Sequence, residues 1–463
     1  MSTEPKKYDA IIIGAGQSGG PLSRTLASSG MKTALIEREH VGGTCINTGC
    51  TPTKTMVASA RVAYLARRAK DYGVHSGNVS VDLEKVRQRK REIVESWRNS
   101  GQKKIEDTDG VDLIFGEAKF LGAKRILVKL NNGDSKELTA EKIFINTGAG
   151  PVIPPLPGLE SVHFFNSTSI MELAELPERL LILGGGYIGL EFGQMFRRFG
   201  SEVTIIQRTG QLLAREDPDI AQEVQKILEE DGINILLNSE AISVENKNGI
   251  SLKVKTRNTE KEINGTHILV AVGRRANTHQ LDLPAAGIEA DQRGFVKVNG
   301  KLETTVFGVY AMGDVKGGPA FTHISYDDYR IIKSNLLENG NRTTDDRLVP
   351  YVVFIDPQLG RVGLSETEAR KKGFKIKIAK IPMSYIARAI EVKETRGMMK
   401  LIVDADKEQI LGCAILGIEG GELMAILQMA MIGKIPFAKI QDGIFAHPTL
   451  AESLNNLFKS IEN

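Results

Sequence analysis

The stretch YDAIIIGAGQSGG, residues 8–20, decides the fold, because its apolar strand runs directly into the glycine pattern Gly14-x-Gly16-x-x-Gly19. A helical stretch follows, and a second apolar strand, KTALIE, ends at Glu37. In this setting the glycines permit a tight turn and the close approach of a diphosphate, which the N-terminus of the helix attracts. The Glu37 carboxylate can accept a hydrogen bond from a ribose hydroxyl. The pattern therefore predicts a dinucleotide-binding α/β domain.

The same pattern returns later in the chain. The segment RLLILGGGYIGLEF carries Gly184, Gly186 and Gly189 in the same spacing and is followed by the strand SEVTIIQR. Each copy closes with an apolar strand that ends in glycine, IFINTG at Gly148 and HILVAVG at Gly273. A repeated fingerprint in one chain predicts two dinucleotide sites.

The two sites differ at the end of the second strand. The first copy has the acid Glu37 there, whereas the second has Gln207, followed by Arg208 and later by Arg215. A carboxylate would repel a ribose 2′-phosphate, and an arginine would bind it with two hydrogen bonds. The second site therefore favours NADPH, with NADH as the alternative. If the two arginines are merely solvated surface residues, this preference disappears.

The rest of the chain suggests the domain order. The segment YAMGD, ending at Asp314, indicates a return to the first dinucleotide domain. From about residue 345, alternating strands such as GMMKLIVDA and QILGCAILG precede a helical GELMAILQMAMIGK. We expect a first dinucleotide domain, a second one, a return to the first or central domain, and an α+β packing or dimer domain, over residues 1–150, 151–280, 281–344 and 345–463.

Basic and acidic residues nearly balance, with 60 Lys and Arg against 57 Asp and Glu and a formal net charge of +3. No sustained basic stripe occurs, which argues against nucleic acid as the main partner and against binding to an acidic membrane. The start MSTEPKKYDA lacks an apolar signal core, and no uncharged apolar run is long enough to span a bilayer. We therefore expect a cytoplasmic protein, in which thiols are kept reduced.

The motif GGTCINTGCTPTKT, residues 42–55, contains Cys45 and Cys50, two of the chain's three cysteines. Zinc sites usually need four ligands, and neither a second cysteine pair nor suitably spaced histidines exist, so we predict no metal site. A structural disulfide would close a very small loop in a reducing compartment. Redox chemistry is the best interpretation that remains.

The residues after Cys50 support that interpretation. Thr51-Pro52-Thr53 predicts a helix start, since proline is tolerated in the first turn, and the helix should cover about 53 to 71. Its amide-rich N-terminus would stabilise a thiolate at Cys50. Lys54 falls one turn into the helix, where its cation could serve a flavin or a carboxylate, or where it could be an ordinary surface lysine.

In this order, the motifs resemble those of the class I pyridine nucleotide-disulfide oxidoreductases, the family of dihydrolipoamide dehydrogenase, glutathione reductase and mercuric reductase. The resemblance runs from YDAIIIGAGQSG to HPTLAESLN, nearly the whole chain. It implies an α/β fold with two Rossmann-like domains, for FAD and for NAD(P)H, and a C-terminal α+β dimerisation domain. The implied function is to pass electrons from NAD(P)H through the flavin and the Cys45–Cys50 disulfide to a disulfide or related small-molecule acceptor.

The resemblance also assigns catalytic roles. Cys50 corresponds to the thiolate that faces the flavin, and Cys45 to the thiol that exchanges with the substrate. Lys54 resembles the lysine near the reactive edge of the flavin, paired with Glu191.

His447 and Glu452 in FAHPTLAE resemble the acid-base pair that completes the active site of the other subunit of a homodimer. Thiol exchange expels a thiolate, which a neighbouring imidazole can protonate. Alternatively, Thr449-x-x-Glu452 is a capping box, in which case Glu452 only starts a helix.

The fingerprints and the resemblance together assign the cofactor contacts. Tyr187 lies where glutathione reductases place a tyrosine that gates the nicotinamide pocket. The FAD set comprises Gly14, Gly16, Gly19, Glu37, Gly43, Thr44, Lys54, Ala118, Gly148, Asp314 and Thr322. The NAD(P)H set comprises Gly184, Gly186, Tyr187, Gly189, Arg208, Arg215 and Gly273.

The electron acceptor stays open, because the chain departs from each named relative. Mercuric reductases carry a C-terminal cysteine pair, whereas this chain ends SLNNLFKSIEN, and they have tyrosine where His447 stands. Because the first strand begins at residue 8, we do not expect their frequent N-terminal metal-binding domain here. Cys413, within ILGCAILG, is expected to be a buried core residue rather than a metal relay. Dihydrolipoamide dehydrogenases usually keep an acid where this chain has Gln207. Glutathione reductases typically space the lysine after the second cysteine differently.

Two further hypotheses remain. Copper(II) reductases of bacterial reactive-chlorine defence share CINxGCxPTKT and an HPxxxESLN-like terminus, and a thiolate pair beside a flavin can bind and reduce soft metal ions such as Cu(II) or Hg(II). A flavin-binding dimer without turnover belongs to another class, and the intact catalytic positions argue against it.

Overall fold

The computed structural model describes residues 4–345 and 347–461 of the 463-residue chain. They form two compact units. Unit 1 takes in Met1–Thr55, Arg87–Val152 and Gly273–Arg347, and unit 2 takes in Met56–Val86, Ile153–Val272 and Leu348–Asn463. The four-segment domain division remains a prediction. In the described part of the chain, no helix combines the length and apolarity that a membrane span requires.

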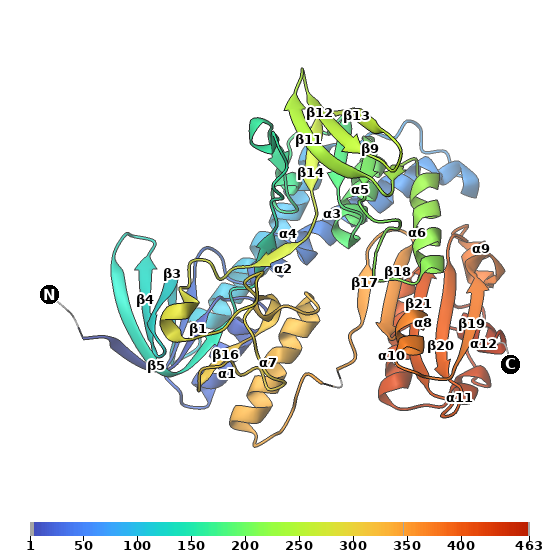
Figure 1. Ribbon diagram of the computed structural model, residues 1–463. Coiled ribbons are helices and arrows are strands. Elements are labelled where there is room, and N and C mark those ends of the chain that lie inside the picture. The colour runs from blue at the N-terminus through green and yellow to red at the C-terminus, as the bar shows by residue number, and fades with distance from the viewer. Residues whose placement is uncertain (1–3, 346, 462–463) are drawn as a thin grey trace. The chain divides into compact units, whose positions relative to one another are not determined.

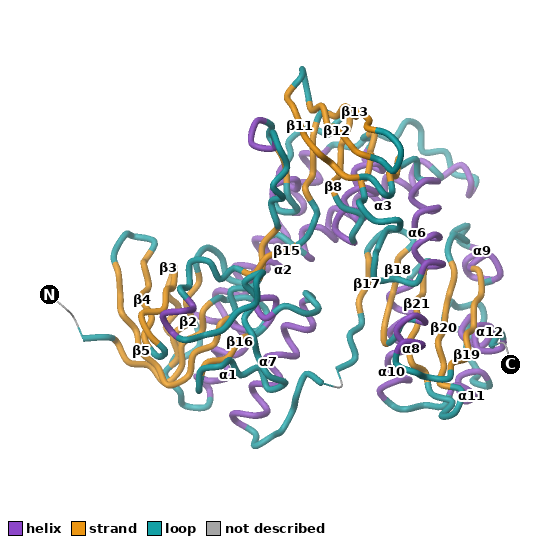
Figure 2. Tube along the Cα trace, viewed as in Figure 1, coloured by secondary structure: helices purple, strands orange, loops and turns teal. Residues whose placement is uncertain are grey.

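Six strands form the sheet of unit 1 within the described residues. They are β1 (Lys6–Ile13), β2 (Thr33–Glu37), β3 (Val111–Gly122), β4 (Arg125–Leu130), β5 (Ser135–Ile145) and β16 (Val309–Ala311). β1 pairs in parallel with β2 and with β5, while β16 pairs with β5 and β3 with β2, also in parallel. β4 lies antiparallel between β3 and β5, which Figure 2 shows as adjacent orange strands.

The side chains of β1 alternate between two cores, as the two-residue period of a strand requires. Ala10 and Ile12 pack in the cluster that also holds residues of α1 (Gly19–Ser28) and α7 (Thr322–Leu337). Tyr8, Ile11 and Ile13 pack in the cluster that holds residues of β4 and β5. Because both faces are covered there, the strand is apolar and buried from Ala10 to Ile13, as expected of a parallel strand.

Two long helices and several short elements also contribute to unit 1. α4 (Leu83–Glu106) and α3 (Cys50–Arg67) each begin in one unit and end in the other. The remaining elements are α2 (Gly43–Asn47), β6 (Ala149–Pro151), β15 (Arg274–Ala276), η4 (Leu283–Ala286) and η5 (Gly313–Lys316).

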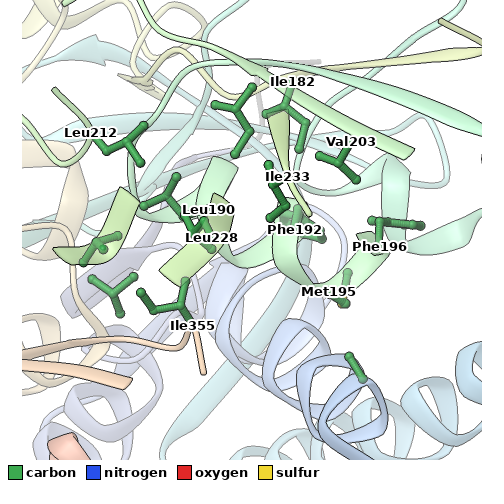
Figure 3. Packing of buried hydrophobic residues seen from close by; sticks show 14 of the residues in the cluster. Ile182, Leu190, Phe192, Met195, Phe196, Val203, Leu212, Leu228, Ile233 and Ile355 are labelled. Carbon is green, nitrogen blue, oxygen red and sulfur yellow. The ribbon is translucent and has the colours of Figure 1, made fainter. Parts of the chain in front are cut away.

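Unit 2 contains a second parallel sheet, in the order β10-β9-β8-β14-β7. Its strands are β7 (Phe164–Phe165), β8 (Arg179–Leu183), β9 (Glu202–Ile206), β10 (Asn234–Leu236) and β14 (His267–Val270). Leu190, Phe192 and Phe196 of α5 (Tyr187–Phe199) pack with Ile182 and Val203 on one face of this sheet (Figure 3). α6 (Pro218–Glu230) contributes to the same cluster.

The opposite face of this sheet carries an antiparallel three-stranded sheet made of β11 (Glu240–Asn246), β12 (Ile250–Lys255) and β13 (Glu260–Gly265). Leu252 and Val254 pack there against Leu181 and Leu183. The short elements of this region are η2 (Leu159–Ser161) and η3 (Ser169–Glu172).

The C-terminal part of unit 2 is an antiparallel sheet in the order β17-β18-β21-β20-β19, drawn in orange to red in Figure 1. Its strands are β17 (Tyr351–Val353), β18 (Gln358–Gly363), β19 (Ile376–Pro382), β20 (Met398–Asp404) and β21 (Ile410–Gly417). Its helices are α8 (Glu366–Lys371), η6 (Met383–Tyr385), α9 (Ala387–Glu391), α10 (Gly420–Ile432), α11 (Phe437–Gln441) and α12 (Ser453–Lys459). The expected α/β fold with a C-terminal α+β part is confirmed.

A buried ionic network ties together three parts of unit 2 that lie far apart in the sequence. The Arg198 guanidinium lies 3.1 Å from Asp231 Oδ2 and 2.5 Å from Asp356 Oδ2, and all three side chains are at least nine-tenths buried. Its Cζ is 3.8 Å from the ring centroid of Tyr64 on α3. Arg198 is thus shared by two buried carboxylates, each of which has a second arginine partner, Arg61 for Asp356 and Arg396 for Asp231.

Replacing Arg198 by methionine should cost about 3 kcal/mol of stability, because two buried carboxylates lose their shared partner and each keeps only its second arginine. Urea unfolding of the FAD-loaded protein measures the effect as a lower transition midpoint. Lys226→Met, an exposed position on α6, should stay within about 0.5 kcal/mol of wild type. Equal midpoints for the two variants would contradict the compensating role of Arg198.

Candidate active site

The first glycine fingerprint forms a turn that only glycine fits. Gly14 has φ +106°, and a Cβ there would lie 2.3 Å from the Asn146 carbonyl oxygen. A Cβ on Gly19, the first residue of α1, would lie 2.1 Å from the Gly14 oxygen. Gly16 faces Gly43 closely, since a Cβ on Gly43 would come within 2.8 Å of the Gly16 Cα. The missing side chains leave the N-terminus of α1 open for close approach of a diphosphate.

The second fingerprint reproduces the contacts of the first and third glycines of the first fingerprint. Gly184 has φ +111°, and a Cβ there would lie 2.5 Å from the Ala271 oxygen. A Cβ on Gly189 would lie 2.1 Å from the Gly184 oxygen, while one on Gly186 would meet nothing within 4 Å. The repeated fingerprint therefore forms the same turn at the start of α5, where Tyr187 is the first helical residue.

The ends of the second strands also correspond. Glu37 Oε2 accepts a hydrogen bond from the Ala15 N–H at 2.8 Å, and Gln207 Oε1 accepts one from the Gly185 N–H at 2.9 Å. Gln207 is thus the uncharged counterpart of Glu37 in the same turn. The second site keeps the shape of the first but loses its negative charge.

Arg208 and Arg215 follow in the same segment, and both are exposed. Neither guanidinium makes an ion pair or hydrogen bond with the described residues. Their donors are therefore available to an anion beside the adenosine end of a dinucleotide.

The two cysteines sit on consecutive short elements of unit 1. Cys45 lies in α2 and is partly buried, whereas Cys50 is the first residue of α3 and is exposed. Both are free thiols. The helix start expected around Thr51-Pro52-Thr53 is confirmed, with Pro52 in the first turn. This position brings Cys50 under the partial positive charge of the helix N-terminus.

The thiols are not equivalent. A hydrogen bond to Cys50, ahead of burial, raises the pKa of the Cys45 thiol, and the Lys54 cation opposes this shift. Their positions differ too: Cys50 is exposed at the N-terminus of α3, which stabilises a thiolate, whereas Cys45 is partly buried in α2.

Thr322 contributes more than the sequence indicated. It begins α7, and its Oγ1 lies 3.3 Å from Cys50 Sγ. The hydroxyl also lowers the pKa of Cys45. The resemblance assigned Thr322 only to the FAD set, because the sequence gives no signal that would bring this hydroxyl next to a cysteine far away in the chain.

Lys54 is half-buried and its charge acts on the thiol pair, so it is not an ordinary surface lysine. Glu191 is buried on α5, and its Oε1 accepts a hydrogen bond from the Phe354 N–H at 2.8 Å. Lys54 and Glu191 belong to different units, so their pairing stays a prediction.

His447 and Glu452 form a direct pair in unit 2. The His447 Nδ1 lies 2.9 Å from Glu452 Oε2 and 3.2 Å from Oε1. With Nδ1–H donating to the carboxylate, Nε2 is left to exchange a proton with another group. The Glu452 N–H donates to Thr449 Oγ1 at 3.2 Å, but no capping box forms at α12, because the Glu452 carboxylate is on the imidazole. The reciprocal capping box is absent, but Glu452 does stand at the start of α12, as its N-cap, so its catalytic role stays a prediction.

The remaining candidates lie as follows. Asp314 lies in η5, where burial raises the pKa of its carboxyl and the nearby Arg274 lowers it. Thr44 lies beside Cys45 in α2, and Ala118 is buried on β3. Gly148 follows β5 and Gly273 precedes β15, both with positive φ. Their contacts with a cofactor stay predictions. Cys413 is fully buried in the C-terminal core, as expected.

Among residues 4–345 and 347–461, no group of three or more His, Cys, Asp or Glu side chains is arranged to hold a metal ion.

Comparison with known proteins gives two family matches. Residues 8–328 match the model described as pyridine nucleotide-disulphide oxidoreductase, and residues 349–458 match the dimerisation domain of that family. The "Probable pyridine nucleotide-disulfide oxidoreductase RclA" of Escherichia coli (strain K12) is 40% identical over 460 residues, covering 98% of this chain and 100% of the relative. A mercuric reductase of Staphylococcus aureus is 34% identical, covering 96% of this chain and 81% of the relative.

A solved structure is similar as well. It is described as the Cu(II) complex of the HOCl-induced flavoprotein disulfide reductase RclA from Escherichia coli, with a TM-score of 0.89 and 40% identity. The match covers 98% of this chain and 99% of that chain.

Proposed function

The chain belongs to the pyridine nucleotide-disulphide oxidoreductases, and from this premise we propose that it reduces a small-molecule disulfide with electrons from NADPH, through the Cys45–Cys50 pair. The chain is an NAD(P)H-dependent flavoprotein disulfide oxidoreductase. It uses FAD and NAD(P)H, and the two glycine cradles fit two dinucleotides. When bound, FAD accepts hydride from the nicotinamide and passes the electron pair to the cysteine disulfide.

The observation that carries the proposal is the asymmetry of the dithiol. Cys50 is exposed at the N-terminus of α3, which favours a thiolate, whereas Cys45 is partly buried in α2 and its pKa is raised. In such a pair, Cys45 exchanges with the substrate disulfide and Cys50 resolves the mixed disulfide that forms.

The steps follow from the residues. His447 takes the Cys45 proton, and the Cys45 thiolate attacks one sulfur of the substrate disulfide. A mixed disulfide forms, the substrate S–S bond breaks, and His447 returns the proton to the leaving thiolate. Cys50 then attacks the Cys45 sulfur, which expels the second substrate thiolate and closes the Cys45–Cys50 disulfide. Glu452 holds the imidazole in the tautomer that these transfers need.

The working protein is a homodimer in this proposal, with the His447 and Glu452 pair of one subunit completing the dithiol site of the other. Residues 349–458 match a dimerisation domain. On α10, Met429 and Ile432 are 65% and 57% exposed, and Ile444 is exposed as well, so this domain presents an apolar face for a second subunit to cover. We place the homodimer in the cytoplasm, where NADPH and reduced thiols are available.

Replacing Arg208 by glutamine should lower kcat/KM for NADPH by about tenfold, because one charge-assisted contact with the 2′-phosphate is lost. The value for NADH, which has a hydroxyl there, should change by less than about twofold. Steady-state kinetics with both nucleotides measure the two effects. Lys261→Gln, which removes an exposed charge from β13, serves as the control. An equal loss for both nucleotides would contradict a 2′-phosphate contact.

A second candidate acceptor is Cu(II). The similar solved structure is of a Cu(II) complex of a flavoprotein disulfide reductase. Thiolates bind copper strongly, and the electron pair of the dithiol would reduce two Cu(II) ions to Cu(I). Mercuric ion is a further acceptor of the same chemical kind, favoured by the mercuric reductase relative.

One experiment separates these acceptors. NADPH consumption is followed anaerobically with oxidised lipoamide, with histidine-buffered Cu(II) and with Hg(II) as the only acceptor in turn. Turnover of the disulfide well above that of either metal supports the first proposal. Turnover of a metal without disulfide turnover would overturn it in favour of a metal-ion reductase.

A further inference from the structure

The turn between β12 and β13 carries an arginine that neither fingerprint includes. The Thr256 N–H donates to the Thr259 oxygen at 2.8 Å, and the Thr256 hydroxyl donates to the same oxygen. The turn is therefore closed by its own hydrogen bonds. Arg257 lies at its tip and is exposed.

Arg257 is attached to the segment that carries Arg208. Its Nη2 donates to Asn238 Oδ1 at 3.0 Å, and the Asn238 N–H donates to the Thr209 oxygen at 3.0 Å. The Ser239 N–H in turn donates to the Gln207 oxygen at 3.0 Å. Asn238, with φ +49°, thus bridges the hairpin turn and the residues that follow β9.

Asn238 also lies close to Gly210, in the segment that carries Arg208. A Cβ on Gly210 would lie 3.3 Å from the same Asn238 Oδ1 that accepts from Arg257. The Arg257 guanidinium is therefore linked to the segment 207–211 through a single side chain, that of Asn238. This is the segment in which Gln207 replaces the carboxylate of the first site.

The charge of Arg257 is not compensated by the protein. Among the described residues, no carboxylate lies within ion-pair distance of it, and its partner Asn238 is neutral. Two acids of the same sheet are paired with other cations, Glu260 with Lys253 at 2.6 Å and Glu245 with Lys247 at 2.9 Å. A guanidinium has five N–H donors, and the bond to Asn238 uses only one of them.

We propose that Arg257 is a specificity-determining residue for the 2′-phosphate of NADPH, and that Asn238 positions it. This inference rests on the proposed function, in which Arg208 and Arg215 favour NADPH. A phosphate monoester carries up to two negative charges and three acceptor oxygens, more than a single arginine satisfies. Arg257 reaches the site from a separate sheet, so its contribution is independent of the segment that holds the other two.

The test is Arg257→Gln in the FAD-loaded enzyme. The kcat/KM for NADPH should fall by about tenfold while that for NADH stays within about twofold of wild type. Binding of 2′,5′-ADP, measured by calorimetry, should weaken by the same factor, with binding of 5′-AMP unchanged. Lys255→Gln, two residues away on the same hairpin, is the matched charge control.

A second variant tests the positioning role. Asn238→Asp keeps the shape of the side chain and tolerates the positive φ, but it sets a carboxylate against Arg257. It should lower kcat/KM for NADPH selectively, and combining it with Arg257→Gln should add little to the loss in Arg257→Gln. A loss that affects NADPH and NADH equally would indicate a distorted turn and would overturn the positioning role.

The outcomes distinguish the two proposals. If wild-type enzyme uses NADPH and NADH with equal kcat/KM, the proposed NADPH preference fails and the role of Arg257 fails with it. If wild type prefers NADPH and Arg208→Gln weakens that preference, but Arg257→Gln does not, the inference on Arg257 alone is overturned.

Discussion

A Cys45→Ser enzyme should lose disulfide turnover by about 10³-fold or more, because a serine hydroxyl neither ionises near neutral pH nor forms a disulfide. Uptake of hydride from NADPH by the holoenzyme should persist, since no step before the thiol exchange needs Cys45. Anaerobic absorbance of the flavin measures the hydride step, and NADPH oxidation with lipoamide measures turnover. In a reductive titration, the wild-type protomer should take up one electron pair more than the variant.

The third cysteine provides the control. Cys413 is fully buried in the C-terminal core of unit 2, whereas the dithiol belongs to unit 1. Cys413→Ala should keep both the disulfide turnover and the extra electron pair when normalised to folded holoenzyme. Full disulfide turnover by Cys45→Ser would show that electrons reach the acceptor by a route other than the pair.

The second large effect concerns His447. His447→Gln should lower disulfide turnover by about 10²–10⁴-fold, the usual contribution of a general acid-base group. The loss should shrink as pH rises, because the pKa of Cys45 is raised and a more alkaline solvent replaces the missing base. The measurement is the pH profile of kcat/KM for lipoamide in wild type and variant.

Two further variants define the role of His447. His75→Gln changes an exposed histidine outside the site and should leave the profile unchanged. Glu452→Gln should give an intermediate loss, since the imidazole keeps a hydrogen-bond partner but not a charged one. A pH-independent loss in His447→Gln would argue against proton transfer as its function.

The parallel sheets were predictable because each fingerprint is local. In β1, the apolar residues from Ala10 to Ile13 predict the strand, and Gly14 predicts the position of the turn that follows it. The sequence did not predict the antiparallel pairing of β4 with β3 and β5. β3 pairs in parallel with β2 at one end and antiparallel with β4 at the other, and β5 does the same with β1 and β4. Pairings of that kind depend on contacts between distant segments, which the two-residue period does not encode.

The helix after the cysteines was predicted with shifted ends. The expected range was about 53 to 71, whereas α3 covers Cys50–Arg67 and a separate 3₁₀ turn, η1 (Ala69–Tyr72), follows. At the start, proline is compatible with the first turn, so Pro52 marks the helix without beginning it. At the other end, Gly73 adopts φ +76° and closes the 3₁₀ turn rather than the helix.

At the site, local rules and the family resemblance gave different results. The spacing of Thr449 and Glu452 allowed a capping box as an alternative, but the Glu452 carboxylate makes its hydrogen bond with His447. The local sequence does not determine which of these two partners the carboxylate takes. The contacts of Thr322 with Cys50 and of Arg257 with Asn238 join segments that no sequence period relates. The cysteine asymmetry, by contrast, could be anticipated from the helix start alone.

The exchange of Glu37 for Gln207 in otherwise matching turns has a consequence for assembly. A newly made chain has two glycine-rich turns of nearly the same shape, and the cell contains both flavin and nicotinamide dinucleotides. In the proposed function, charge rather than shape sorts them, because Glu37 would repel a phosphorylated ribose and the arginines near Gln207 would attract one. The replacement of one carboxylate oxygen by the NH2 group of Gln207 would then direct each cofactor to its own domain.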